Sequence, residues 1–281
     1  MSKTAIVTDS TTDMPKDWPG WSRVHVVPIH IQFGEASYRE GIDIDEATFF
    51  RLVDAEGAIP KTSQPSPIDF ADLYRQLAAD HDAILSIHIG AKLSGTYYSS
   101  ALAADMVKDE IAVYPFDSDC GSIGTGFMLL EAMEMIDQGA TPEDVLKRLN
   151  QIRDGMNIML SPITLKYVQL SGRIGALGAT LASVLNIKPI IILRDGQLFA
   201  DERVRTRKRA LNRMVEMIKE QLGDSPARVA VAHSQSPDDA NTLVELTAQA
   251  LNCDKVWISS LSTSLSAHLG PGTVGIVAYP L

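Results

Sequence analysis

A hydroxyl-rich segment near the first quarter of the chain has the residue types to bind an anion. Residues 62–64, Thr-Ser-Gln, lie close to two prolines and precede a predicted helix that Ser66 or Pro67 can begin. The three hydrogen-bonding side chains are therefore not needed to cap that helix. We expect either a rigid site for a small anion or lipid headgroup here, or a purely structural loop.

A second hydroxyl loop, residues 88–97, lies between a predicted strand and a predicted helix over 98–107. Ser94 is a natural N-cap of that helix, and Gly95 would let the backbone approach a ligand closely. A helix N-terminus carries about half a positive charge and unpaired N–H donors, which suit a carboxylate or phosphate. A serine nucleophile is the rival interpretation, but the Gly-x-Ser-x-Gly elbow of hydrolases is missing.

Two acidic loops also follow predicted strands. Residues 8–13 carry hydroxyls and carboxylates that could bind a polar ligand, but capping of a helix that starts near Met14 and Pro15 explains them better. Residues 116–122 contain an Asp-Ser-Asp stretch, which we expect to cap a helix over 121–136 rather than to chelate a cation.

The second half of the chain contributes cations and a histidine. A Gly-rich turn presents Arg173 but lacks the Lys and Thr of a phosphate-binding loop. Residues 203–209 carry five cations at a predicted helix start, where they oppose the macrodipole. A solvated helix start explains part of this cluster, and an anionic partner is the alternative. His268 precedes a Gly-Pro-Gly turn, which allows close backbone approach and a fixed ring.

The elements that position these loops predict an α/β fold. In the first part, short apolar strands alternate with helical patterns, which favours a Rossmann-like parallel sheet covered on both faces. We place a domain boundary after Gly155, giving an N-terminal domain over 1–155 and a C-terminal α/β domain over 156–281. The Asp195-Gly196 turn predicts a hairpin, so the second sheet should be mixed or largely antiparallel. The predicted strands are 5–7, 24–29, 83–87, 111–114, 156–160, 187–193, 198–200, 227–232, 255–259 and 273–278.

Composition excludes several classes of protein. Of 281 residues, 45% are hydrophobic and 21% charged, which is typical of globular domains rather than disordered or fibrous chains. The net charge of −10 disfavours nucleic-acid binding. Two distant cysteines predict neither a disulfide scaffold nor a zinc site. Without a signal-like start or a long apolar run, we expect a soluble cytoplasmic protein with no integral membrane association.

Taken in order, six motifs resemble the DegV family of bacterial fatty-acid-binding proteins over essentially the full chain. The Thr-Ser-Gln-Pro segment and the His-Leu-Gly-Pro-Gly-Thr segment are the specific ones, because both occur in the right order. The motifs are residues 62–67, 93–97, 117–118, 171–174, 188–190 and 268–273.

The resemblance implies a two-domain, non-enzymatic lipid carrier without a cofactor or metal. It implies that a long-chain fatty acid such as palmitate lies in a buried tunnel, with its carboxylate held by the hydroxyls of Thr62 and Ser94. It also implies a partner, a fatty-acid kinase that phosphorylates the presented acid. The headgroup region or partner contact would comprise Ser63, Gly95, Thr96, Ser118, Arg173, Arg203 and His268.

Two other functions are weighed against the carrier. One is an enzyme that acts on a small anionic metabolite at the strand-end loops, for which no convincing catalytic constellation is present. The other is a regulatory or DNA-binding role through residues 203–213, which the acidic composition and the lack of a helix-turn-helix pattern disfavour.

Overall fold

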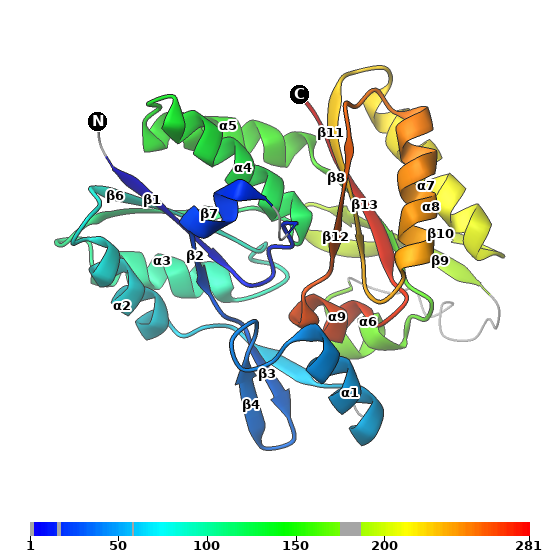
Figure 1. Cartoon of the computed structure of the whole chain (residues 1–281), viewed down its shortest axis with the longest axis horizontal. Helices are drawn as coiled ribbons and strands as arrows, with labels where there is room; N and C mark the ends of the chain where they lie inside the picture. The colour runs from blue at the N-terminus through cyan, green and yellow to red at the C-terminus, as the bar shows by residue number, and fades with distance from the viewer. Residues whose placement is uncertain (1–2, 16–17, 58, 175–186) are drawn as a thin grey trace. The chain divides into compact units, whose positions relative to one another are not determined.

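The computed structural model describes residues 3–15, 18–57, 59–174 and 187–281, and it divides into two compact units (Figure 1). The first unit comprises Met1–Arg153 together with Ser262–Ser264. The second comprises Asp154–Leu261 and Leu265–Leu281. The short segment Ser262–Ser264, which belongs to the first unit, has no counterpart in the domains expected from the sequence.

A four-stranded parallel sheet forms the centre of the first unit, which confirms the predicted fold class. The strands follow the order β2-β1-β6-β7, and every neighbouring pair is parallel. The apolar residues of the two central strands, β1 and β6, are buried because helices cover both faces of the sheet. The bounds are β1 Thr4–Asp9, β2 Val24–Val27, β6 Ala83–His88 and β7 Ala112–Asp117.

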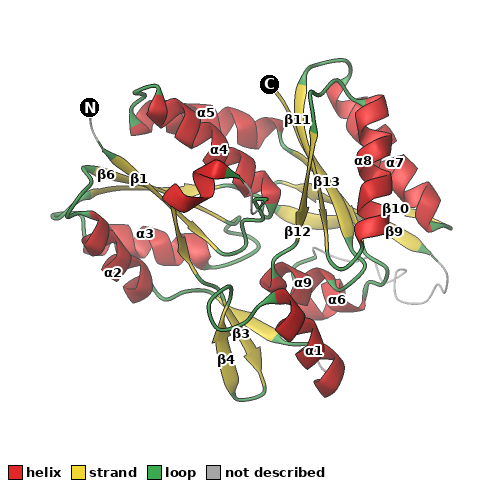
Figure 2. Ribbon diagram, viewed as in Figure 1, coloured by secondary structure: helices red, strands yellow, loops and turns green. Residues whose placement is uncertain are grey.

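Helices of the first unit pack on this sheet (Figure 2). On one face, Phe70 and Tyr74 of α2 and Ala103 of α3 pack against Ala5 and Ile84. Ser66 caps α2 in a reciprocal capping box with Asp69, as the sequence predicts. The bounds are α2 Pro67–Leu77, α3 Thr96–Met106, α4 Ile123–Asp137 and α5 Pro142–Gly155.

A smaller antiparallel sheet in the first unit corrects two predictions. The predicted strand 24–29 forms but is two residues too long, because β2 ends before Pro28, which has no N–H to donate, and the chain continues in β3. The segment with Thr62 forms strand β5 rather than a loop, and it pairs with β3. The bounds are β3 His30–Phe33, β4 Ala36–Arg39, β5 Lys61–Ser63, α1 Glu46–Glu56 and the 3-10 helix η1 Pro19–Arg23.

The second unit contains a six-stranded mixed sheet, in the order β10-β9-β8-β13-β11-β12. Only β11 and β12 are parallel, so the expectation of a mixed, largely antiparallel sheet is confirmed. Asp195 and Gly196 form the predicted hairpin turn with φ values of 48° and 68°. The strand bounds are β8 Asn157–Ser161, β9 Lys188–Arg194, β10 Gln197–Val204, β11 Ala227–His233, β12 Val256–Ser260 and β13 Val274–Pro280.

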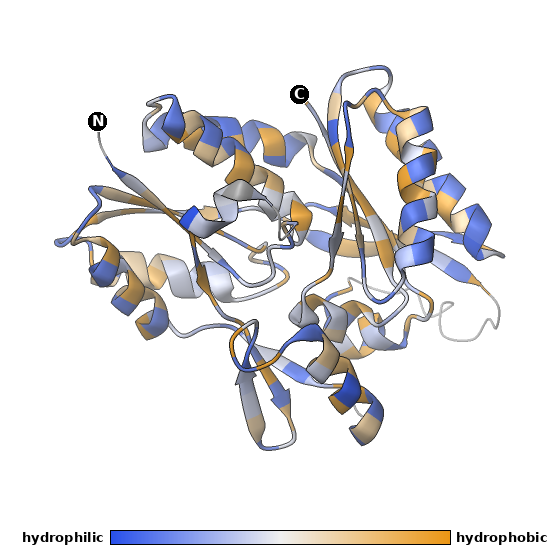
Figure 3. Ribbon diagram, in the orientation of Figure 1, coloured by the Kyte–Doolittle hydropathy of each residue, from blue (hydrophilic) through white to orange (hydrophobic). Residues whose placement is uncertain are grey.

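Two long helices bury an apolar stripe against this second sheet. Figure 3 shows hydrophobic and hydrophilic residues alternating around α7 and α8. Leu211, Met214 and Ile218 of α7 pack with Val229 and Val231 of β11 in one core cluster. The helix bounds are α6 Lys166–Ser171, α7 Arg207–Leu222, α8 Pro237–Ala250 and α9 Thr263–Leu269.

Candidate functional site

The carboxyl ends of β1 and β6 carry a buried polar network at the point where the strand order of the first sheet reverses. Asp9 Oδ2 lies 3.1 Å from His88 Nδ1, and both side chains are fully buried. Burial alone would raise the pKa of Asp9, but the hydrogen bond and charge of His88 outweigh it and lower that pKa. Asp9 and His88 therefore form a structural pair at the base of the strand-end loops.

Asp9, His88 and Ser86 contact one another in the acid–histidine–serine order of a serine hydrolase. His88 Nε2 lies 2.7 Å from Ser86 Oγ, which lies 2.7 Å from the hydroxyl of Tyr74. Ser86, His88 and Tyr74 are all 0% exposed, however. Burial raises the pKa of Tyr74 to about 12, so its hydroxyl stays neutral. A substrate cannot reach Ser86, and the arrangement stabilises the core rather than providing a nucleophile.

Thr62 and Ser94 lie on neighbouring segments of the first unit. Both side chains are half-buried, Thr62 on β5 and Ser94 just before α3. Gln64 joins the two segments, because its amide donates to Ser99 Oγ at 3.5 Å and lies over Gly95. A Cβ at Gly95 would meet the Gln64 amide atoms at 2.3–2.5 Å. Gly95 therefore makes room for Gln64, whereas the sequence had suggested that it makes room for a ligand.

Ser94 is not the N-cap of α3, which corrects the sequence prediction. The helix starts at Thr96 with Gly95 as N-cap and no capping side chain. Ser94 Oγ instead lies 2.9 Å from Thr96 Oγ1, and Thr96 is 0% exposed. The Ser94 hydroxyl is thus fixed by a buried neighbour while Ser94 itself stays half-buried.

The loop after β7 is built for structure. Ser118 is fully buried, and its hydroxyl donates to the Cys120 carbonyl at 3.2 Å. Asp117 Oδ1 accepts from the N–H groups of Ala91 and Asp119, at 3.0 Å each. Burial raises the pKa of the Cys120 thiol to about 11, so Cys120 is a small buried residue with a neutral thiol. The following helix, α4, starts at Ile123 with no side-chain cap, so the prediction that residues 116–122 cap it is wrong.

Two buried carboxylates hold the segment Ser262–Ser264 in the first unit: Asp13, from the loop 8–13 considered above, and Glu40, which the sequence did not single out. Glu40 accepts hydrogen bonds from the hydroxyls of Ser10 at 2.6 Å, Thr263 at 2.7 Å and Ser264 at 2.6 Å, and from the Ser264 N–H at 2.6 Å. Asp13 Oδ1 accepts from the Ser262 N–H at 2.8 Å. The partners in Ser262–Ser264 lie more than 220 positions away in the chain, so no local pattern could reveal them.

Burial raises the pKa of both carboxyl groups. It places the pKa of Asp13 well above the usual range, and the nearby charge of Glu40 adds to the increase. The pKa of Glu40 is also raised by burial, against the opposing effect of its four hydrogen bonds. The loop after β1 does not cap a helix near Met14 and Pro15, because the first helical turn of the described residues is η1. That prediction is wrong, and the side chains of the loop serve this network.

In the second unit, Arg173 and His268 are close enough to interact electrostatically. Burial, and secondly the positive charge of Arg173, lowers the pKa of His268 to about 4. The turn after His268 requires glycine twice, because Gly270 and Gly272 have φ values of 82° and 76°. A Cβ at either glycine would also collide with the side chain of Tyr167 or Ile163, respectively. His268 is therefore an uncharged ring beside a tightly packed turn.

Three cations of the basic cluster 203–213, Arg207, Arg209 and Arg213, pair with acids of the second unit. Arg209 pairs with Glu216 at 2.9 Å. Arg213 pairs with Glu202 at 2.8 Å and with Glu220 at 2.7 Å. Arg203 has an exposed side chain at the end of β10. Acids that the fold brings near therefore match part of the surplus of cations seen in the sequence.

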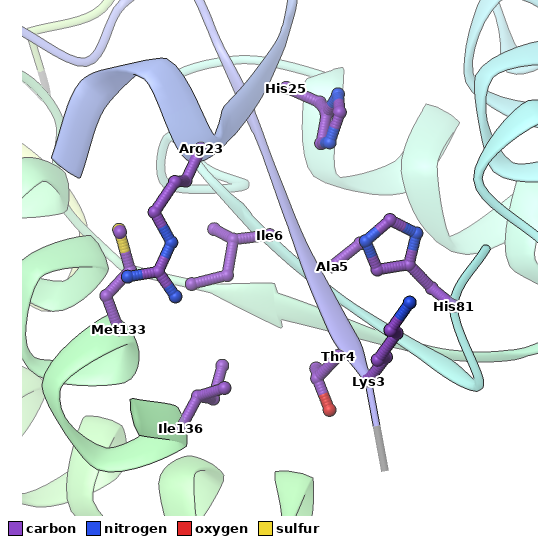
Figure 4. A pocket seen from close by; sticks show the side chains of 9 residues that line it. All are labelled: Lys3, Thr4, Ala5, Ile6, Arg23, His25, His81, Met133 and Ile136. Atoms are coloured by element: carbon purple, nitrogen blue, oxygen red, sulfur yellow. The ribbon is translucent and has the colours of Figure 1, made fainter. Parts of the chain in front are cut away.

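A pocket of ≈ 390 Å³ lies beside the amino end of β1, whereas the loops described above follow the carboxyl ends of the strands (Figure 4). Residues from β1, β2, η1, α4 and the turn before β6 form its wall, and none is among the predicted site residues. Its basic members are not all available to a ligand, because Arg23 pairs with Asp137 at 2.6 Å. The lining residues are Lys3, Thr4, Ala5, Ile6, Arg23, His25, His81, Met133 and Ile136.

Neither a metal centre nor a membrane span is found in the described part of the chain. Within residues 3–15, 18–57, 59–174 and 187–281, no group of three or more His, Cys, Asp or Glu side chains is arranged to hold a metal ion. Among the same residues, no helix combines the length and the hydrophobicity that crossing a bilayer requires.

Comparison with solved structures shows the same fold over the whole chain. A fatty acid-binding DegV family protein from Thermus thermophilus is 35% identical and has a TM-score of 0.92, covering 99% of this chain and 100% of that chain. DegV from Bacillus subtilis, described as a fatty acid binding protein, is 33% identical with a TM-score of 0.89 over 100% of both chains. A stearic acid-binding protein from Eubacterium ventriosum is 25% identical with a TM-score of 0.90, covering 100% of this chain and 98% of that chain.

Sequence comparison agrees with the structural likeness. The DegV protein of Bacillus subtilis (strain 168) is 35% identical over 274 residues, which cover 97% of each chain. A DegV domain-containing protein of Deinococcus radiodurans is 32% identical over 278 residues, covering 99% of this chain and 98% of the relative. Residues 3–281 match the family described as uncharacterised proteins of the DegV family. This chain belongs to the DegV family.

Proposed function

We propose that this protein is a lipid carrier that binds a long-chain fatty acid, such as palmitate, in a buried tunnel. Thr62 and Ser94 hold the carboxylate of the acid at the mouth of the tunnel. The observation that carries the proposal is the placement of two half-buried hydroxyls on adjacent segments, joined by Gln64 and Gly95. The names of the solved relatives, which describe fatty acid binding, support the same ligand class.

The physical chemistry of such a complex favours tail burial for affinity and hydroxyls for selectivity. Burying about 14 methylenes at about 0.8 kcal/mol each gives about 11 kcal/mol before the costs of association. A hydrogen bond to a carboxylate adds about 1.5–3 kcal/mol. Affinity therefore comes mainly from the tail, and preference for the acid over other headgroups comes from Thr62 and Ser94.

Hydroxyl ligands also suit a carrier that hands its acid to a kinase. A bidentate arginine would occupy the carboxylate lone pairs, whereas neutral hydroxyl donors leave the oxygens nucleophilic. We therefore include a fatty-acid kinase as the partner in this proposal. The residues assigned to the headgroup region or to partner contact are Ser63, Gly95, Thr96, Ser118, Arg173, Arg203 and His268.

The chemistry of the strand-end loops gives no support to the enzymatic alternative. The Asp9–His88–Ser86 series is fully buried. Thr96 and Ser118, two of the proposed headgroup residues, are also fully buried. In the proposal Thr96 acts by fixing the half-buried Ser94 rather than by direct contact with the ligand. Ser118, whose hydroxyl contacts the buried Cys120 and Thr125, acts by stabilising the loop after β7.

Mass spectrometry of lipid extracted from denatured, purified protein tests the proposal. We expect a long-chain fatty acid in near-stoichiometric amount, and a protein emptied of lipid should take up added palmitate to the same ratio. Recovery of a sugar phosphate or another small polar metabolite would contradict the carrier. Failure of the delipidated protein to bind added palmitate would contradict it as well.

A further inference from the structure

Arg207 begins α7 in an electrostatically unfavourable place. The N-terminus of a helix carries positive potential, yet α7 has no acidic residue in its first turn, where Arg207, Lys208 and Arg209 stand. The side chain of Arg207 is only 18% exposed, so it does not extend into solvent as a solubilising charge would. Solvation therefore does not explain its position.

The guanidinium group of Arg207 instead makes three contacts inside the second unit. Nε donates to Asp239 Oδ2 at 2.8 Å, and Asp239 is itself held by the Ser236 hydroxyl at 2.9 Å. Nη1 donates to the carbonyl of Ser161 at 2.6 Å, and Nη2 donates to the carbonyl of Gly272 at 2.7 Å. The planar guanidinium directs these donors in fixed directions, which the single ammonium of a lysine cannot reproduce.

The two carbonyl groups belong to different segments. Ser161 ends β8, and the chain continues through Ile163 and then α6, which contains Tyr167, to Arg173. Gly272 lies in the turn that follows His268 and leads into β13. Arg207 therefore ties the segment that carries Arg173 to the segment that carries His268.

The backbone N–H groups of the two glycines in this turn also make hydrogen bonds within the second unit. The Gly270 N–H donates to the Ser266 carbonyl at 2.8 Å, and the Gly272 N–H donates to the Ser234 carbonyl at 2.7 Å. The two glycines pack against Tyr167 and Ile163 so tightly that neither has room for a Cβ. The pairing of β13 with β8 places Val274, two residues after Gly272, beside Ser161, and Arg207 adds the contact to the Gly272 carbonyl itself.

We propose that Arg207 is a positioning residue, which holds the His268 turn against the Ile163–Arg173 segment and so fixes the histidine beside the arginine. This inference rests on the proposed function only in calling Arg173 and His268 headgroup residues. The contacts themselves belong to the ligand-free fold of the second unit.

The titration of His268 reports this position directly. Burial and the charge of Arg173 hold its pKa at about 4, compared with the ordinary value of 6.5. If the turn separates from the Ile163–Arg173 segment, the imidazole gains solvent and loses the influence of Arg173. Its pKa should then rise.

The experiment measures the pKa of His268 by NMR in delipidated protein, with the resonance assigned by its loss in His268→Gln. We expect Arg207→Met to raise this pKa by about one unit or more. Arg209→Met is the matched control, because it removes a charge from the same helix turn but breaks only a surface pair with Glu216, and it should leave the His268 pKa unchanged. Arg207→Lys keeps the charge and should restore only part of the wild-type value.

Two results would overturn the inference. One is an unchanged His268 pKa in Arg207→Met, and the other is full recovery in Arg207→Lys, which would assign the effect to charge rather than to geometry. If Arg207→Met fails to fold, Asp239→Asn serves instead, since it weakens the Nε contact and should shift the pKa in the same direction by a smaller amount.

A ligand measurement separates this inference from the proposed function. The affinity of each variant for palmitate is measured in parallel with the pKa. A raised pKa with unchanged palmitate affinity would leave the positioning role intact and would remove His268 from the headgroup region. An unchanged pKa overturns the positioning role whatever the affinity does.

Discussion

Removal of either proposed carboxylate ligand should weaken acid binding far more than alcohol binding. Ser94→Ala and Thr62→Val each remove one hydroxyl donor. A hydrogen bond to a charged group contributes about 1.5–3 kcal/mol, so each change should weaken palmitate binding about 10- to 150-fold. The same change should weaken hexadecanol binding only about 2- to 10-fold, because a bond between neutral groups contributes about 0.5–1.5 kcal/mol.

The local geometry refines the expectation for Ser94. Its Oγ lies 2.9 Å from Thr96 Oγ1, whose side chain is fully buried. When Thr96 donates to Ser94, the Ser94 hydrogen is available to a ligand, and the donor chain is polarised toward the carboxylate. Thr96→Val removes this polarisation but no direct contact. It should therefore weaken palmitate binding by less than about threefold.

Isothermal titration of delipidated protein with palmitate and with hexadecanol measures these ratios. Ser22→Ala is the control, because Ser22 is an exposed serine of η1 in the same unit. It should leave both affinities unchanged. Equal losses for acid and alcohol in Ser94→Ala and Thr62→Val would refute the assignment of the hydroxyls to the carboxylate.

Three further predictions follow from contacts in the first unit. Gly95→Ala should displace the flexible Gln64 amide and lower palmitate affinity, and in a double-mutant cycle Gln64→Ala should relieve about 0.5–1 kcal/mol of that loss. Glu40→Ala should lower the free energy of unfolding by about 3 kcal/mol, since it leaves the buried Ser264 N–H without its acceptor, and the shape-conserving Glu40→Gln should cost less than half as much. Burial raises the pKa of Asp13 in the folded protein above 3.8, the value expected in the unfolded chain. Asp13 therefore stabilises the fold fully below pH 3.8, and this contribution is lost as the pH rises through the folded pKa. Asp13→Asn should flatten this decline.

Each of these has a specific measurement and a contradicting outcome. Palmitate affinities that are additive in Gly95→Ala and Gln64→Ala would show that the two positions are independent. Urea unfolding reports the first unit through Trp18 and Trp21 when Trp257, in the second unit, is replaced by phenylalanine. Equal costs for Glu40→Ala and Glu40→Gln would contradict the role given to Glu40. A decline of stability with rising pH that is equally steep in Asp13→Asn and in the wild type would contradict the role given to Asp13.

Short-range signals predicted the fold well because they depend on neighbouring residues. The Asp195-Gly196 hairpin forms because both residues adopt positive φ, and Ser66 starts α2 because its hydroxyl reaches Asp69 N three residues on. The parallel sheet was predicted because strands buried on both faces are apolar throughout. The family resemblance was carried by six short motifs, and the comparisons confirm it.

Long-range contacts account for what sequence reasoning missed. Ser94 fits an N-cap by residue type, but the helix starts two residues later and the hydroxyl contacts Thr96 instead. Gly95 fits a ligand approach by its small size, but Gln64 fills the space. The acids that neutralise the basic start of α7 are up to 32 positions away, as with Arg207 and Asp239. Such partners are chosen by tertiary packing, which a local pattern does not record.

A crystal structure of the protein with palmitate tests the central claim most directly. The account predicts that the two carboxylate oxygens lie within about 2.5–3.0 Å of Thr62 Oγ1 and Ser94 Oγ, with the alkyl chain enclosed by apolar side chains. A palmitate whose carboxylate contacts neither hydroxyl, or whose chain lies on the surface, would contradict it.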